Sequence, residues 1–145
     1  MLDDQLARLR PLAEPATDAA ILAAETAIGR PLPADYKHFL RLTNGLPGRT
    51  PTQSSYLSLF AVEDLPHSQQ WHPPPLPRPV LCFGTNGGGD GFFFDYATPG
   101  PAVLMIAFIS NWTQDALWHG DSFTDFLDRV TSGWDPFKGA GSHRA

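Results

Sequence analysis

The feature that most constrains this chain is a helix end followed closely by a helix start, over residues 28–45. Gly29 can adopt the left-handed conformation that ends a helix, and Pro33 suits the first turn of the next one. Asn44 and Gly45 can then end that second helix. Its apolar positions recur at helical spacing, at Tyr36, Phe39, Leu40 and Thr43. The pattern predicts two helices joined by a short turn, with one face of the second helix in the core.

Two helices are expected before this turn, a short first one and the one that Gly29 ends. Leu2, Leu6 and Leu9 mark a short amphipathic helix, and Thr17 is a good N-cap for the helix that follows. On that helix Glu25 falls on the apolar stripe, where a buried carboxylate needs hydrogen-bond donors. We expect it to clasp the free amides at the start of the next helix, around residues 34–36. A catalytic acid with a raised pKa is the alternative, but it needs a cleft and a second group.

After residue 45 the pattern changes to short strands. Residues 45–52 are expected to be loop, and Glu63 to Leu65 a single helical turn. The segment over residues 66–79 is rich in proline, which cannot supply ladder amides, so it is expected to be an extended surface excursion. The predicted strands cover residues 56–60, 80–83, 92–96, 102–109 and 113–119.

The last predicted helix begins after Ser122, a good N-cap, with Asp125 placed as in a capping box. Its apolar residues fall at i, i+3, i+4 and i+7, at Phe123, Phe126, Leu127 and Val130. Beyond residue 132 the periodicity is lost. The expected organisation is one α+β domain over residues 1–131, with N-terminal helices and a C-terminal helix packed on a mainly antiparallel sheet, followed by a glycine-rich tail over residues 132–145.

The composition limits the number of domains, the cellular compartment and the class of partner that we expect. The chain has 145 residues, of which 42% are hydrophobic, enough for one domain with its own core. Cys82 is the single cysteine, so no disulfide framework exists, and the start of the chain resembles no signal peptide. These features predict a soluble cytoplasmic protein. The net charge of -5 disfavours direct binding to nucleic acid and allows a basic protein partner.

The candidate chemical sites have simpler structural explanations. The glycines at residues 87–89 lack the lysine of a phosphate-binding loop, and Asn86 with Gly87 is typical of a hairpin turn. Asp90 and Asp95 could bind a cation, but turn stabilisation is favoured because no third ligand has suitable spacing. The histidines are scattered, at His38, His67, His72, His119 and His143. We therefore expect no enzyme activity, no metal site and no cofactor.

Three motifs in order give the chain a family resemblance: residues 25–45, the glycine-rich segment ending at Asp90, and residues 121–127. Together they resemble the SUKH superfamily, named partly for a yeast cell-wall-assembly regulator linked to killer-toxin resistance. The resemblance covers about residues 17–130. It implies an α+β domain without a catalytic constellation, and its bacterial members commonly bind and neutralise polymorphic toxins, often nucleases.

Exposed aromatic and acidic side chains would suit a basic toxin, through anchoring rings and electrostatic steering. The predicted partner-binding residues are Glu63, Asp64, Trp71, Trp112, Asp115 and Asp121. The residues expected to have structural roles are Glu25, Gly29, Pro33, Tyr36, Asn44, Gly45, Asp90, Ser122 and Phe123. The predicted function is steric and electrostatic blockade of a toxin. A general interaction or regulatory module is the alternative. A small-ligand-binding protein or hydrolase comes third and would need a deep polar pocket near Glu25 or Asp90.

Overall fold

A computed structural model describes residues 13–49, 56–68, 80–87, 89–98, 100–107 and 116–132 of the chain. Outside these residues lie the predicted first helix, Trp71, Trp112, Asp115, most of the proline-rich segment and nearly all of the tail. The described helices are α2 (Asp18–Ile28), α3 (Ala34–Leu42), α4 (Leu65–Ser68) and α5 (Phe123–Thr131), with a 3-10 turn η1 (Val62–Asp64). None of the described helices is both long and apolar enough to cross a membrane.

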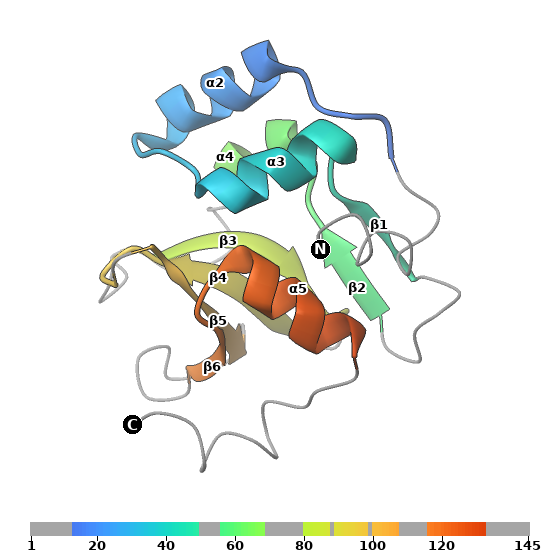
Figure 1. The fold of residues 1–145 in the computed structure, drawn as a ribbon, viewed down its shortest axis with the longest axis vertical. Helices are drawn as coiled ribbons and strands as arrows, with labels where there is room; N and C mark the ends of the chain where they lie inside the picture. Colours follow the sequence, from blue (N-terminus) through green and yellow to red (C-terminus); the bar gives the residue numbers. More distant parts are fainter. Residues whose placement is uncertain are drawn as a thin grey trace.

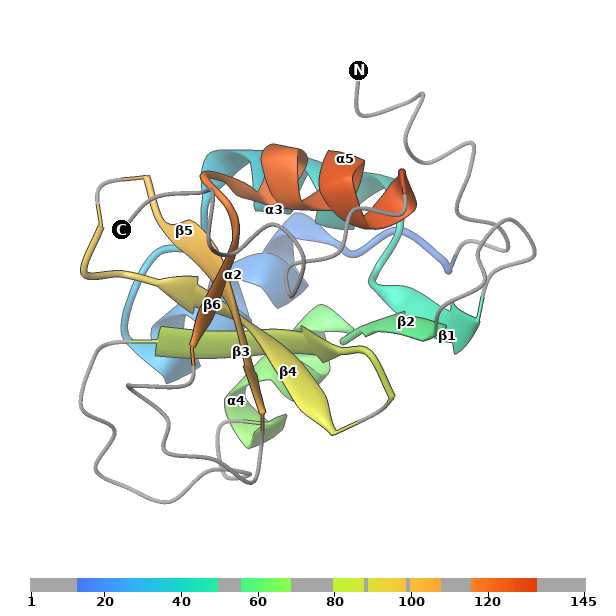
Figure 2. The ribbon, with the colours of Figure 1, turned by 90° about the horizontal axis from the view of Figure 1, so that it is seen from below.

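Six strands form one antiparallel sheet in which each strand pairs with its neighbour in sequence (Figure 1). They are β1 (Leu46–Arg49), β2 (Tyr56–Leu59), β3 (Val80–Thr85), β4 (Asp90–Asp95), β5 (Ala102–Ala107) and β6 (Leu117–Gly120). The fold class is α+β, as predicted. Figure 2 shows α3 and α5 side by side, which brings the starts of two helices close together.

The helix ends follow the local sequence signals. The Thr17 hydroxyl accepts a hydrogen bond from the amide of Ala20, and Gly29 ends α2 with a φ of 87°. The Ser122 hydroxyl caps α5 by accepting from the amide of Asp125 at 3.1 Å. The Asp125 carboxylate in turn accepts from the amide of Asp121, one residue before the position that a capping box would use.

The expected loop is wrong at residues 46–49, which form β1 and pair with β2, and residues 50–52 lie outside the described residues. The sequence of β1, Leu-Pro-Gly-Arg, has few strand signals, but an edge strand can hold a proline because one side has no ladder partner. α3 also ends earlier than expected, at Leu42, and Thr43 is extended. Gly45, with a φ of 85°, serves the turn into β1, where a Cβ would collide with the Leu59 carbonyl.

Smaller shifts occur at strand ends. β4 begins at Asp90, two residues before the predicted start, because Asp90 pairs with Ala107 of β5. The described part of the last strand begins at Leu117, and the earlier residues predicted for it lie mostly outside the described part. The predicted helical turn at residues 63–65 is present as η1 and the start of α4.

The helices all contribute to a core on one face of the sheet, where aromatic rings meet. Tyr36 is fully buried, with its ring centroid 5.0 Å from those of Phe94 and Phe123. Strand alternation places a second buried cluster on the opposite face, formed by Cys82, Phe93, Leu104 and Ile106.

Candidate functional site

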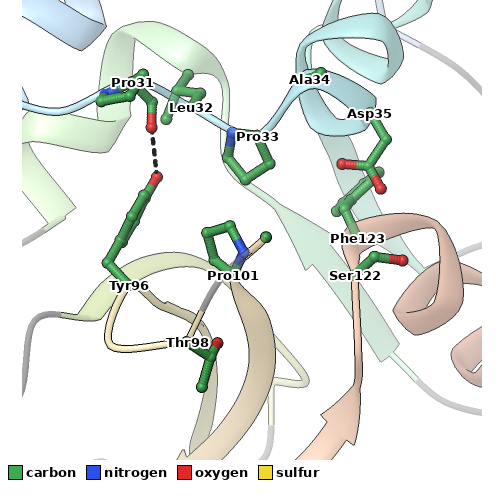
Figure 3. A pocket seen from close by; sticks show the side chains of 11 residues that line it. Pro31, Leu32, Pro33, Ala34, Asp35, Tyr96, Thr98, Pro101, Ser122 and Phe123 are labelled. Atoms are coloured by element: carbon green, nitrogen blue, oxygen red, sulfur yellow. Dashed lines mark hydrogen bonds between the residues drawn. The ribbon is translucent and has the colours of Figure 1, made fainter.

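A pocket of about 620 Å³ opens beside this core, where three parts of the chain meet (Figure 3). The first part is the α2–α3 connection with the start of α3, over residues 31–35. The second is the β4–β5 connection, with Tyr96, Thr98 and Pro101, and the third is the start of α5 at Ser122 and Phe123. Figure 3 shows Tyr96 at one end of the pocket and Asp35 at the other.

The Tyr96 end is fixed by contacts with the α2–α3 connection. The Tyr96 hydroxyl donates to the Pro31 carbonyl at 2.9 Å, across 65 residues of sequence. The Arg30 guanidinium lies over the Tyr96 ring, 4.8 Å from its centroid. Partial burial raises the pKa of Tyr96 to about 12, although the charge of Arg30 opposes that rise. The phenol therefore stays protonated even in moderately alkaline solution, so it keeps the hydrogen bond to the Pro31 carbonyl there.

The Asp35 end joins two helix N-termini. One Asp35 carboxylate oxygen accepts from the amide of Tyr36, and the other accepts from both the amide and the hydroxyl of Thr124, all at 2.9 Å. Free amides at a helix start favour a negative group, and here the protein supplies that group itself. Asp35 thus ties α3 to α5 across 89 residues of sequence and leaves a carboxylate at the edge of the pocket.

The pocket is otherwise apolar, and its hydroxyl groups have internal roles. Thr98 accepts from the amide of Ala102 and donates to the Asp95 carbonyl, while Ser122 caps α5. The described lining residues include no histidine, cysteine, lysine or arginine. The Ser122 hydroxyl accepts from the Asp125 amide, as an N-cap does.

Glu25 supports the pocket from behind. One of its carboxylate oxygens accepts from the amide of Leu32 at 2.8 Å and lies 3.2 Å from the ammonium of Lys37. The predicted partners, the amides around residues 34–36, are therefore wrong: Glu25 binds the earlier amide of Leu32, and the amide of Tyr36 donates to Asp35. Since Leu32 lines the pocket and Glu25 does not, the carboxylate holds the pocket backbone in place.

The predicted partner-binding residues separate into two groups. Asp121 is exposed and precedes Ser122, so it lies next to the pocket in sequence, and its carboxylate accepts from the Trp118 indole at 3.0 Å. Glu63 and Asp64 are exposed on η1, which does not line the pocket. The Glu63 carboxylate accepts from the side chain of Asn44. Contact of a partner with any of these acids stays a prediction.

Asp90 and Asp95 take part in turns. The Asp90 carboxylate accepts from the Asn86 side chain at 2.9 Å, and the Asn86 amide oxygen accepts from the Asp90 backbone at 3.2 Å. The Asp95 carboxylate accepts from the amide of Ala97. Within the described ranges no group of three or more His, Cys, Asp or Glu side chains is placed to hold a metal ion.

Sequence reasoning missed the pocket and the role of Asp35. An acidic residue in the first turn of a helix is already explained by the helix dipole, so Asp35 gives no extra signal. Its partner Thr124 lies in another helix, and no local pattern connects the two.

Comparison with protein families assigns most of the chain to a known family. The model of the SMI1 / KNR4 family (SUKH-1) matches residues 15–129, from just before α2 to near the end of α5. No curated protein matches the chain.

Proposed function

Because the chain belongs to the SMI1 / KNR4 family (SUKH-1), we propose that it is an immunity-type protein that binds a cognate toxin and covers the toxin's active site or substrate groove. The observation that carries the proposal is the pocket between α3, α5 and the β4–β5 connection. It is apolar, held by internal hydrogen bonds and open at the surface. A preformed apolar recess beside charged residues is the usual place for an anchoring side chain in a protein interface.

Charge supports a basic toxin as the partner. The chain has a net charge of -5, and Asp35 and Asp121 lie in or next to the pocket. Toxins that act on nucleic acids carry basic surfaces for the phosphate backbone, and an acidic protein is steered toward such a surface. The bound protein would then block the toxin's groove sterically, and electrostatic attraction would speed the approach of the two proteins.

The third function considered from sequence receives less support. A small-ligand enzyme would need convergent polar groups near Glu25 or Asp90. The described pocket near Glu25 is mainly apolar, and the carboxylate of Asp90 is hydrogen-bonded in a turn.

The test is an affinity capture with the tagged full chain from its own cells, washed at moderate salt, with partners identified by mass spectrometry. We expect a near-stoichiometric basic partner whose toxicity is neutralised on mixing. Raised salt should slow association, because steering by exposed charges is screened. If a toxin is encoded beside this protein and the cells express it, failure to capture that toxin would refute the proposal for it. A reproducible complex with housekeeping proteins alone would favour the regulatory alternative.

A further inference from the structure

We infer that the pocket binds one arginine or lysine side chain of the partner, with its aliphatic stem between the apolar walls and its positive charge at Asp35. That this side chain belongs to a toxin rests on the proposed function. That the pocket binds such a side chain can be tested without any toxin.

The walls fit a long aliphatic stem. Figure 3 shows Pro33 and Pro101 facing each other, between the Tyr96 end and the Asp35 end. Proline fixes its own φ, and the Tyr96 hydroxyl is bonded to the Pro31 carbonyl, so these walls need little reorganisation on binding. Arginine and lysine are the side chains that bury several methylene groups while keeping a charged end apart from them.

The charge at the far end selects a cation. Asp35 is the one charged residue among the described lining residues. Its carboxylate accepts three hydrogen bonds, from Tyr36 and Thr124, and a carboxylate has about four acceptor positions. Among the described residues these are the donors to Asp35, which leaves one position for a donor from outside. The nearby basic residues do not neutralise it, because Arg30 stacks on Tyr96 at the other end and Lys37 pairs with Glu25.

The same geometry disfavours an anion. Helix starts commonly attract phosphate or carboxylate groups, and both α3 and α5 begin at this pocket. Asp35 already occupies that position, so a second anion would meet its negative charge. Binding of an anion or of an equally large neutral molecule with the same affinity would therefore contradict the inference.

The experiment uses the full-length isotope-labelled protein and three probes of similar length: n-butylguanidinium, pentanoate and 1-pentanol. Amide chemical shifts are followed by NMR up to about 50 mM of each probe, since a fragment this small binds with a Kd on the order of millimolar at best. We expect saturable shifts from butylguanidinium at Ala34, Thr98 and Phe123. Pentanoate and pentanol should bind at least about tenfold more weakly. Equal binding of the three probes, shifts at other sites, or no saturable shift would overturn the inference.

A matched pair of variants tests whether the probe binds in this pocket. Ala34 is exposed and lines the pocket, so Ala34→Trp should fill it and abolish the shifts. Ala19 is equally an exposed alanine in the first turn of a helix but does not line the pocket, so Ala19→Trp should leave binding unchanged. Asp35→Asn should weaken butylguanidinium binding about fivefold or more while leaving pentanol binding unchanged. If Asp35→Asn fails to fold, the Ala34 and Ala19 pair still decides the question.

The pair also separates this inference from the proposed function. With a neutralised toxin in hand, Ala34→Trp should weaken neutralisation at least about tenfold and Ala19→Trp should not. Equal neutralisation by both variants would refute the pocket as anchor while leaving the immunity function intact. If the pocket binds guanidinium saturably but the capture experiment yields only housekeeping proteins, the pocket assignment stays intact and the immunity function is replaced by the regulatory alternative.

Discussion

The core under the helices and the pocket beside it share Phe123 but are built in different ways. In the core, the ring of Tyr36 contacts those of Phe94 and Phe123 at 5.0 Å, and the space is filled by side chains. In the pocket, the walls are joined by hydrogen bonds between distant segments, such as Tyr96 to Pro31. Packing alone would favour closing an apolar recess, because burial of apolar surface is favourable. Ring packing thus determines the positions of side chains in the core, whereas hydrogen bonds fix the positions of the pocket walls.

Two tyrosines show the contrast in one residue type. The hydroxyl of Tyr36 is fully buried and has no hydrogen-bond partner in the described structure. The hydroxyl of Tyr96 reaches the Pro31 carbonyl and forms part of the pocket wall. In the core, ring packing outweighs the cost of a hydroxyl without a hydrogen bond among the described residues. In the pocket, the wall is held by the hydrogen bond of the Tyr96 hydroxyl.

The largest expected effect comes from removing the residue that both regions share. Phe123→Ala should lower the free energy of unfolding by about 3–5 kcal/mol, the usual cost of deleting a buried phenyl ring, and it should also disorder the pocket. Urea denaturation measures the loss. Leu22→Ala is the control, because Leu22 is 64% exposed and its removal should cost little. A loss below about 1 kcal/mol for Phe123→Ala would contradict the assignment of this ring to the core.

The second largest effect should come from alkaline pH, which should lower the free energy of unfolding because two buried side chains resist ionisation in the folded state. Burial raises the pKa of Cys82 from 9.0 to about 12, against a smaller opposing effect of a backbone hydrogen bond with Gly84, and burial also raises that of Tyr36. The unfolded chain therefore releases these protons at lower pH than the folded chain. The stability they contribute is complete below about pH 9 and is lost as pH rises toward 12.

For Cys82 the loss amounts to on the order of 4 kcal/mol across that range. Urea midpoints measured from pH 8 upward should fall, and Cys82→Ala should fall less steeply. Identical slopes for the two proteins would show that the thiol ionises as easily in the folded state as in the unfolded state.

Asp35→Ala should have the next largest effect, a loss of about 2–3 kcal/mol, because it removes charge-assisted hydrogen bonds at two helix starts. It should also release α5 from α3, which faster hydrogen exchange at Thr124 would reveal. Asp64→Ala removes an exposed carboxylate on η1 and should change stability by less than about 0.5 kcal/mol. Similar losses for the two variants would mean that the bridge between the helices contributes nothing.

The smallest effects should differ in sign between the two tyrosines. Tyr96→Phe removes the hydrogen bond to Pro31 and should cost about 1 kcal/mol. Tyr36→Phe removes a buried hydroxyl that lacks a partner and should leave stability unchanged or raise it by up to about 1 kcal/mol. Thermal unfolding of both variants compares them directly. A loss at Tyr36 as large as that at Tyr96 would indicate a partner, such as a buried water, for the Tyr36 hydroxyl.

The features predicted correctly depend on residues close in sequence. The caps at Thr17 and Ser122 and the left-handed Gly29 each need signals within about four residues. β1 could not be predicted, because pairing with β2, rather than the sequence Leu-Pro-Gly-Arg, makes it a strand. For Glu25 the helix face indicated a need for hydrogen-bond donors, but the amide that it binds, that of Leu32, follows from the path of the α2–α3 connection, which no local pattern gives. The pocket needs contacts across 65 and 89 residues, which no local pattern contains.

The contact between Asp35 and Thr124 also sets the order in which the pocket can arise during synthesis. Its first wall leaves the ribosome with residues 31–35 and its second with the β4–β5 connection, but the last wall belongs to α5. Until α5 has emerged and docked, the Asp35 carboxylate lacks both Thr124 donors. The pocket is therefore absent from nascent chains, and any partner that depends on it can bind only after translation has passed α5.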